Sequence, residues 1–277
     1  MTNEHRERLA AYLRDAADRL GVTIEGKTVH GLYDRTIAAP VSGPAWLRLT
    51  TEQPRWAAED TMWDGIATAT GEPFAGIPMP QHLRSDVWTD DGLVVRADLL
   101  TYVGQQAIST GLVLDRDVDL GDRWWQALHT GLEPLQRITT TKRVGADPRE
   151  ESFRNHFLAS FGAKIDPERV EMAMSHGDLH FGNLTAPELI ILDWENWGWA
   201  PTGYDAAHLL CSAILQPSVA ARVQAEFADV LDTYSGAVAV LTAASKYLHH
   251  VESGEFPDVA IPIRRCAEAA IRDRLTA

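Results

Sequence analysis

The sequence has few of the features that mark secreted, membrane-bound or cysteine-dependent proteins. It contains only two cysteines, Cys211 and Cys266, too few for a disulfide framework or a cysteine-rich zinc site, so both are expected to be buried thiols. The first twenty residues carry too many charges for a signal peptide. No apolar run approaches about 18 residues, the length of a membrane span. We therefore expect a cytoplasmic protein without a membrane partner.

Positive charge is also scarce. The chain has 25 Lys and Arg against 39 Asp and Glu, a net charge of −14, and the acids are spread along its length. A strongly acidic surface disfavours nucleic acid and helps to steer cationic ligands toward the protein, although it is equally compatible with plain solubility. The charge balance thus argues against a nucleic-acid partner and leaves a cationic small molecule open.

The first third of the chain is rich in β-favouring residues. An amphipathic helix is predicted over residues 2–20, and residues 22–50 then contain short β-favouring runs separated by Gly, Asp and Pro. A helix is predicted over residues 54–69. Two further β runs, residues 86–89 and 93–96, flank Asp90-Asp91-Gly92, a hairpin turn signal. These features predict a small antiparallel sheet.

Helices dominate beyond residue 104, and no internal repeat or low-complexity linker interrupts the 277 residues. They are predicted over residues 117–138, 148–161, 167–175, 204–215, 219–251 and 261–275. Sheets and helices that segregate along the chain indicate an α+β fold with two lobes. We place a small β-rich N-terminal lobe with its leading helix at residues 1–102, and a larger helical C-terminal lobe at residues 103–277.

Two neighbouring segments in the helical part carry most of the chemical information. They are Ser175-His176-Gly177-Asp178-Leu179-His180-Phe181-Gly182-Asn183-Leu184 and Leu189-Ile190-Ile191-Leu192-Asp193-Trp194-Glu195. Phosphoryl transfer needs a carboxylate that orients the attacking hydroxyl and accepts its proton, and an amide oxygen and a second carboxylate that hold Mg²⁺ against the nucleotide phosphates. The spacing predicts Asp178 as the catalytic base and Asn183 and Asp193 as the magnesium ligands.

The residues around these three support magnesium and argue against zinc. The four apolar residues before Asp193 predict a buried strand, and a carboxylate at its end is costly unless it is paired or binds a metal. Oxygen ligands of this kind suit Mg²⁺. His176 and His180 flank Asp178, but a third soft or imidazole ligand at suitable spacing is lacking, so a zinc site is not expected.

The motif resembles that of the aminoglycoside phosphotransferase and choline kinase-like family, in which a His-Gly-Asp-Leu-His-x-Gly-Asn loop precedes Asp-Trp-Glu at the end of a strand. The resemblance implies a two-lobed protein-kinase-like fold and Mg²⁺-dependent transfer of the γ-phosphate of ATP or GTP to a hydroxyl of a small molecule. A protein kinase acting on polypeptides is disfavoured, because the HRD and DFG forms and an activation segment are lacking.

The resemblance also implies roles for residues outside the predicted base and metal ligands. His176 would be structural and bond within the loop, and Asp205 would brace the catalytic loop. The backbone of Thr101-Tyr102-Val103, near the expected seam between the lobes, would contact the nucleotide base. His180 is expected to be structural or to line the substrate site. Glu195 is expected either to contact substrate or a second metal ion, or to be a solvated or structural residue.

The N-terminal lobe departs from the kinase pattern. Kinase-like folds supply a Lys on the third strand, paired with an acid on the next helix. The matching strand here, residues 45–50, carries Arg48, which can bind phosphate bidentately but differs from Lys in reach and shape. Its acid partner is Glu59 or Asp60, and the sequence does not separate them. The loop between the first strands has one glycine, Gly31, and no GxGxxG.

These departures leave open a non-catalytic ligand-binding protein on the same fold. Against this, a protein freed from catalysis has no evident reason to keep Asp178, Asn183 and Asp193. Among the acceptors of a kinase, an aminoglycoside-type antibiotic is the first choice, since the loop looks most like that of the aminoglycoside phosphotransferases. Choline, homoserine, methylthioribose and macrolide kinases share the motif.

Two of the nine tryptophans, Trp197 and Trp199, follow Asp193 closely. Core packing is the ordinary role of such residues. Alternatively, one of them forms a wall of the substrate cleft, where a tryptophan over a cationic amine would make a cation–π contact. Choline-type and aminoglycoside acceptors would both benefit from that contact.

Overall fold

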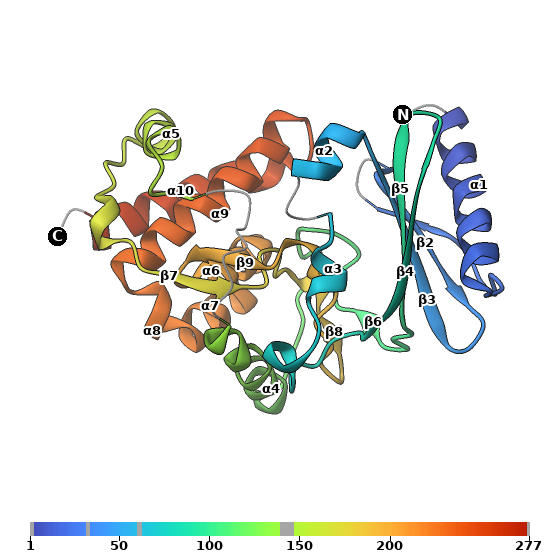
Figure 1. Cartoon of the computed structure of the whole chain (residues 1–277). Coiled ribbons are helices and arrows are strands. Elements are labelled where there is room, and N and C mark those ends of the chain that lie inside the picture. Colours follow the sequence, from blue (N-terminus) through green and yellow to red (C-terminus); the bar gives the residue numbers. More distant parts are fainter. Residues whose placement is uncertain (1–2, 32–33, 60–62, 139–146, 276–277) are drawn as a thin grey trace. The chain divides into compact units, whose positions relative to one another are not determined.

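The computed structural model describes residues 3–31, 34–59, 63–138 and 147–275, and the chain divides into two compact units (Figure 1). Unit 1 consists of residues 1–72 and 79–104, and unit 2 of residues 73–78 and 105–277. The five-stranded antiparallel sheet of unit 1 and the many helices of unit 2 confirm the predicted α+β class. The assignment of a nucleotide-binding lobe and an acceptor lobe stays a prediction.

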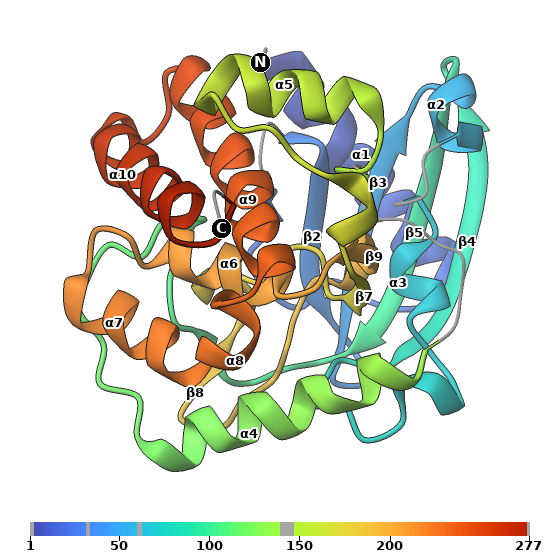
Figure 2. The same cartoon turned by 90° about the vertical axis from the view of Figure 1, so that its left-hand side faces the viewer.

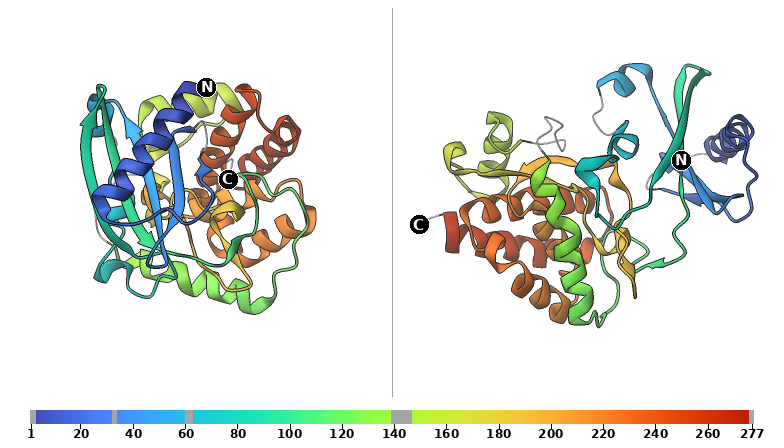
Figure 3. Two further views of the ribbon diagram at one scale, coloured as in Figure 1. Left: turned by 90° about the vertical axis from the view of Figure 1, so that its right-hand side faces the viewer. Right: turned by 60° about the horizontal axis from the view of Figure 1, so that its bottom comes forward.

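The sheet of unit 1 is antiparallel throughout and has the strand order β1-β2-β3-β5-β4. Its strands are β1 (Val29–His30), β2 (Thr36–Val41), β3 (Ala45–Glu52), β4 (His82–Asp90) and β5 (Leu93–Thr101). Helix α1 (Asn3–Leu20) lies across one face of the sheet (Figure 3, left). Its buried Leu9 and Leu13 join one hydrophobic core with Leu47, Leu49 and Ala97.

Alternation along β3 and β5 leaves a polar face opposite α1. Because successive side chains of a strand point to opposite faces, the residues between the core positions lie on that second face. Arg48 of β3 is the cross-strand neighbour of Asp98 on β5, and Thr50 is the neighbour of Arg96. The sheet therefore gathers charged side chains on one face while its other face packs against α1.

The predicted hairpin is confirmed as β4 and β5. Asp91 and Gly92 in its turn have φ angles of 44° and 74°, as the two central residues of a type I′ turn require. The single helix predicted over residues 54–69 is wrong in part, because the structure has two shorter helices. These are α2 (Pro54–Glu59) and α3 (Gly65–Thr68), and residues 60–62 lie outside the described residues.

Unit 2 is built around helix α9, which packs against both α6 and α10 (Figure 2). Its helices are α4 (Asp122–Leu132), α5 (Glu151–Phe161), α6 (Tyr204–Ser212), α7 (Pro217–Glu226), α8 (Ala228–Leu231), α9 (Tyr234–Glu252) and α10 (Ala260–Ala270). The buried Val238, Leu241 and Tyr247 of α9 contribute to one core with Phe157 of α5 and Ile263 of α10. Within the described ranges, no helix is long and apolar enough to cross a membrane.

Two short ribbons in unit 2 frame the motif. They are β6 (Gln106–Ala107) with β8 (Thr185–Ala186), and β7 (Met172–Ser175) with β9 (Gly198–Pro201). The helix predicted over residues 167–175 is wrong: a 3₁₀ turn, η4 (Pro167–Arg169), is followed by β7. Met, Ala and Glu favour a helix, but pairing with β9 overrides that local preference.

The strand predicted over residues 189–192 is also wrong. Leu189 and Ile191 are buried as expected, but the segment makes only the isolated bridge between Leu184 and Ile191. An apolar run of four residues indicates that the segment is buried, but it does not show that another strand lies beside it to pair with. The backbone of Ile191 is instead held by the carbonyl of Pro78, also in unit 2.

Candidate active site

The motif forms a loop between β7 and β8 that the chain closes tightly at Gly177. This residue has a φ of 84°, in the left-handed region that favours glycine. A β-carbon there would overlap the backbone carbonyl of Asn196, at the end of the 3₁₀ turn η6 (Trp194–Asn196). The loop and the segment after Asp193 therefore approach each other more closely than any residue with a side chain permits.

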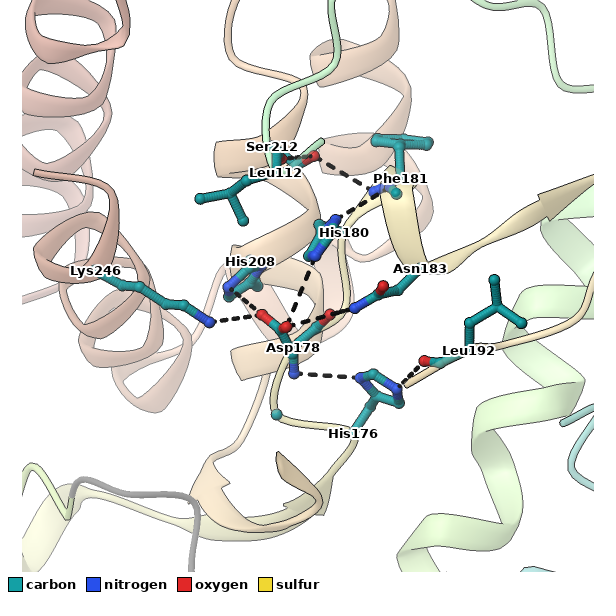
Figure 4. A network of polar contacts seen from close by, with 12 residues as sticks. Leu112, His176, Asp178, His180, Phe181, Asn183, Leu192, His208, Ser212 and Lys246 are labelled. Carbon is teal, nitrogen blue, oxygen red and sulfur yellow. Dashed lines mark hydrogen bonds and ion pairs between the residues drawn. The ribbon is translucent and has the colours of Figure 1, made fainter. Parts of the chain in front are cut away.

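Asp178 and Asn183, the predicted base and metal ligand, are in contact (Figure 4). The side-chain amide of Asn183 donates to the backbone carbonyl of Asp178 at 2.9 Å, and its Nδ2 lies 3.4 Å from Asp178 Oδ2. The 3₁₀ turn η5 (Phe181–Asn183) brings the two together. Because the amide nitrogen is used in this way, the amide oxygen of Asn183 is the atom left for a metal ion.

Asp193 follows Leu192, whose backbone is hydrogen-bonded to Asn183. The N–H of Leu192 donates to the backbone carbonyl of Asn183 at 2.8 Å, which ties the backbone just before Asp193 to that of Asn183. Asp193 itself has a φ of 59°, an uncommon conformation for a non-glycine residue that often occurs at functional sites. One amide oxygen and one carboxylate form a donor set that fits Mg²⁺.

Both ring nitrogens of His176 are bonded to the backbone around the site, which supports the structural role predicted for this residue. The ring Nε2 donates to the carbonyl of Leu192 at 2.8 Å, and Nδ1 accepts the N–H of Asp178 at 3.2 Å. Burial lowers the pKa of His176 to about 4, so the ring is neutral near pH 7, as these two bonds require. His176 thus links the backbone of the predicted base to the residue before Asp193.

Asp205 lies in the first turn of helix α6 and is bonded to the loop. Its carboxylate accepts the backbone N–H groups of His176, at 2.8 Å, and of Gly177, at 3.0 Å. Burial raises the pKa of Asp205 to about 6, although the two N–H donors oppose that shift. One side chain thus satisfies two consecutive buried N–H groups, which supports the bracing role that the resemblance implied for Asp205.

Sequence reasoning missed two residues that contact Asp178. Lys246 Nζ lies 2.6 Å from Asp178 Oδ1, and His208 Nε2 lies 3.4 Å from the same oxygen. The sequence contains a feature that could have identified each of these two residues. Lys246 is the one Lys, Arg, Asp or Glu between Asp232 and Glu252, and His208 follows Asp205 by three residues, on the same face of α6.

The charges around Asp178 determine its protonation. Burial alone would raise the pKa of Asp178, but Lys246 and His180 outweigh burial and hold it well below its usual range. His180 Nδ1 accepts the N–H of Gly182, so its Nε2, 3.7 Å from Asp178 Oδ2, carries the proton. His180 is thus bound to the loop, in line with its structural interpretation.

The aromatic residues after Asp193 separate into buried and partly exposed positions. Trp197 is buried and packs edge-on against Phe74, with ring centroids 5.0 Å apart. Trp199 lies in β9 opposite Met174 and is half-buried, as is Glu195 in η6. Trp197 is therefore a core residue, and Trp199 and Glu195 are the two left as candidates for contact with an acceptor.

In unit 1, Arg48 is half-buried on the polar face of the sheet. Its guanidinium donates to Thr50 Oγ1 at 2.9 Å. The acid nearest to it by strand register is Asp98, which accepts a bidentate pair of bonds from Arg96 and lies 3.1 Å from His82 Nε2. The side chain of Glu59 and all of Asp60 lie outside the described residues. Asp98 is thus a third candidate partner for Arg48, from a strand instead of a helix.

Two of the backbone amides in Thr101-Tyr102-Val103, the segment predicted to contact the nucleotide base, already have hydrogen-bond partners. The N–H of Thr101 donates to the carbonyl of Gln81, and the N–H of Tyr102 to that of Pro44, both inside unit 1. These two amides are therefore already bonded. Contact of Thr101-Tyr102-Val103 with a nucleotide base stays a prediction, and it would have to use backbone groups other than these two amides.

Replacing Gly177 with Ala is expected to destabilise the protein more than replacing Gly162 with Ala. Both glycines have positive φ, which costs an alanine roughly 1–2 kcal/mol. A β-carbon at Gly162 meets open space, whereas one at Gly177 overlaps Asn196. We expect the overlap to add roughly 1–3 kcal/mol. Urea unfolding of the two variants measures the difference, and equal losses would contradict the close approach.

Comparison with known proteins connects this geometry to one family. Residues 114–237 match the model of the phosphotransferase enzyme family, and this segment contains Asp178, Asn183, Asp193 and Asp205. The match confirms the resemblance predicted from the motif and, with it, the prediction of a small-molecule phosphotransferase. The curated proteins contain no match to the chain.

Solved structures share the fold at low sequence identity. A thermostable mutant of aminoglycoside phosphotransferase APH(4)-Ia, in a ternary complex with ADP and hygromycin B, has a TM-score of 0.63 at 12% identity, covering 94% of this chain and 98% of its own. Amicoumacin kinase hAmiN, with AMP-PNP, Ca²⁺ and Ami, has a TM-score of 0.59 at 11% identity, covering 97% and 96%. A GDP complex of an aminoglycoside 2′-phosphotransferase-IIIa variant has a TM-score of 0.61 at 15% identity, covering 95% and 97%. These likenesses confirm the predicted kinase-like fold.

Proposed function

Because the chain resembles the phosphotransferase enzyme family in its motif and over residues 114–237, we propose that it is a Mg²⁺-dependent kinase of a small molecule. The γ-phosphoryl group of ATP or GTP would be its donor, and a hydroxyl its acceptor. One observation carries the proposal. Asp178 contacts Asn183, whose backbone is bonded to the residue before Asp193, so a carboxylate base and a metal-binding pair lie on one frame.

In this proposal Asp178 orients the acceptor hydroxyl and takes its proton. The hydroxyl oxygen forms a bond to the γ-phosphorus as the bond to the bridging oxygen breaks, and the nucleoside diphosphate leaves. The low pKa of Asp178 makes it a weak base. A weak base suffices where the transition state is loose, because bonding to the acceptor, and therefore loss of its proton, comes late. Positioning is then the larger part of what Asp178 contributes.

Asn183 and Asp193 are the residues that would hold the metal ion, and Mg²⁺, when bound, supplies positive charge against the nucleotide phosphates. The frame around them is built from backbone bonds and from the neutral ring of His176. On the polar face of unit 1, we propose that Arg48 binds phosphate.

Replacing Asp193 with Ala is expected to abolish the Mg²⁺-dependent part of nucleotide binding, because it removes the one carboxylate of the proposed metal pair. Calorimetry with ATP and with GTP, each with and without Mg²⁺, measures this and selects the donor. The matched control is Asp119→Ala, at an exposed aspartate in a loop of unit 2. Failure of the wild type to bind either nucleotide would refute the proposed function, and Mg²⁺-dependent binding that survives in Asp193→Ala would refute the ligand assignment.

We propose an aminoglycoside-type antibiotic as the first acceptor to test. The motif looks most like that of the aminoglycoside phosphotransferases, and two of the three solved structures described above carry that name, one of them with hygromycin B bound. Amicoumacin, the substrate named for a third, belongs in the same screen, as do choline, homoserine, methylthioribose and macrolides. Phosphorylation is read directly as a mass increase of the acceptor in the presence of the donor that calorimetry selects.

A further inference from the structure

The two oxygens of the Asp178 carboxylate have different surroundings (Figure 4). Oδ1 is bonded to Lys246 Nζ at 2.6 Å and lies 3.4 Å from His208 Nε2. Oδ2 has longer contacts, 3.4 Å to Asn183 Nδ2 and 3.7 Å to His180 Nε2. One oxygen is therefore held by a short ion pair, and the other is held loosely.

Lys246 is an unexpected cation at its position in the chain. It lies in the middle of α9, where its neighbours Ala243, Ala244 and Tyr247 are fully buried in the core of unit 2. Its own side chain is 35% exposed. A charge on an otherwise apolar helix costs free energy unless it is paired. Burial alone would lower the pKa of Lys246, but Asp178 raises it above its ordinary value, so the side chain is a cation.

The ion pair has a mechanical consequence. The terminal torsion of an aspartate is broad and roughly two-fold, so an unanchored carboxylate turns easily about its own axis. A strong charge-assisted bond at one oxygen removes that freedom. Because Lys246 Nζ is bonded to Oδ1, the direction of Oδ2 is fixed with respect to the loop that carries Asn183.

We propose that Lys246 is a positioning residue of the phosphoryl-transfer site, which holds Oδ1 of Asp178 so that Oδ2 faces the acceptor hydroxyl. This inference rests on the proposed function. It goes beyond the motif, because the anchor comes from α9, 68 residues after Asp178 in the chain. Near-attack geometry is sensitive to such orientation: a displacement of about 1 Å can cost roughly 10²-fold in rate.

A purely structural ion pair would have different consequences. It would connect α9 to the loop and contribute to folding, and its loss would lower the melting temperature without a selective effect on turnover. Partly buried ion pairs often contribute little net stability. The deciding quantity is therefore the change in kcat relative to the change in nucleotide KM.

The first arm of the test is kinetic. Lys246→Met keeps the apolar stem and removes the charge, and Lys246→Arg keeps the charge. Lys164→Met is the matched control at an exposed lysine. Transfer of the γ-phosphoryl group to water, read as nucleotide hydrolysis, serves before an acceptor is identified. We expect kcat of Lys246→Met to fall roughly 10²-fold with an unchanged nucleotide KM. Lys246→Arg should recover part of that loss, because a guanidinium also bonds a carboxylate.

The second arm is spectroscopic and does not need turnover. The chain has four lysines, at positions 27, 142, 164 and 246, so protein labelled with [ε-¹³C]lysine gives four side-chain signals. The signal that disappears in Lys246→Arg belongs to Lys246. It should shift in Asp178→Asn, while the other three stay in place.

The outcomes separate the two proposals. If Lys246→Met retains the wild-type kcat, the positioning role is wrong. It is also wrong if the Lys246 signal keeps the same chemical shift in Asp178→Asn. Equal losses in kcat and in nucleotide affinity also overturn it. If the wild type and Lys164→Met neither bind nor hydrolyse nucleotide while the Lys246 signal still responds to Asp178→Asn, the proposed function fails although the ion pair exists.

Discussion

Replacing Asp178 with Asn is expected to lower kcat by roughly 10²- to 10⁴-fold, the usual contribution of a positioned general base. The carboxamide has nearly the same size as the carboxylate but cannot accept the proton of an acceptor hydroxyl at neutral pH. The substitution also removes the negative charge that pairs with Lys246, so the side chain at position 178 is held less firmly. Nucleotide affinity should change little, because Asp178 is not among the proposed metal ligands.

The measurement is turnover beside calorimetry on the same preparation. Asp119→Asn, at an exposed loop position, controls for the general effect of removing an acid. Retention of the wild-type kcat in Asp178→Asn would contradict the assignment of the base. Loss of nucleotide affinity together with kcat would instead place Asp178 among the groups that bind the donor.

A double mutant adds a stringent check on the site as a unit. If Lys246 acts through Asp178, the variant with both Asp178→Asn and Lys246→Met should be about as slow as Asp178→Asn alone. Additive losses would show that the two side chains act separately. This cycle requires only kcat values and is independent of the identity of the acceptor.

Replacing Asp205 with Ala is expected to lower the free energy of unfolding by roughly 2–6 kcal/mol. The variant leaves two buried N–H groups, those of His176 and Gly177, without their acceptor, and each unsatisfied group costs roughly 1–3 kcal/mol. Asp205→Asn should cost less, because its carbonyl oxygen still accepts one of the two bonds. The catalytic loop should lose order in both variants, so turnover falls as well.

Urea or thermal unfolding measures the loss. Asp229→Ala is the matched control, since Asp229 also lies in the first turn of a helix but is exposed. Surface substitutions of this kind usually stay within about 0.5 kcal/mol of the wild type. If Asp205→Ala proved no worse than Asp229→Ala, the bracing role of Asp205 would be wrong.

The sequence predicted what depends on short spacings. Asp178 and Asn183 lie five residues apart, and the short turn between them brings their side chains into contact. The β4–β5 hairpin was predictable for the same reason, because Asp91 and Gly92 accept the positive φ angles that a two-residue turn requires. The amphipathic pattern of α1 likewise identified the face that packs against the sheet.

Local propensity failed where a distant segment decided the conformation. Residues 172–175 have the composition of a helix, but they form β7 because β9, more than twenty residues later, offers a partner strand. The apolar run 189–192 is buried without becoming a strand, since burial requires only apolar surroundings and a strand requires a neighbour. Asp98 is a candidate partner of Arg48 only because strand register places β5 beside β3.

The sequence by itself determined the chemical class of this protein, since the identity and spacing of Asp178, Asn183 and Asp193 are local properties of one loop and the segment after it. The tertiary structure alone decided what surrounds the base. Lys246 and His208 lie on α9 and α6, and only the packing of those helices brings an ammonium group and an imidazole ring to Asp178. The physical reason is that a spacing along the chain constrains residues a few positions apart, whereas the field at a carboxylate is the sum over every charge that the fold brings near it.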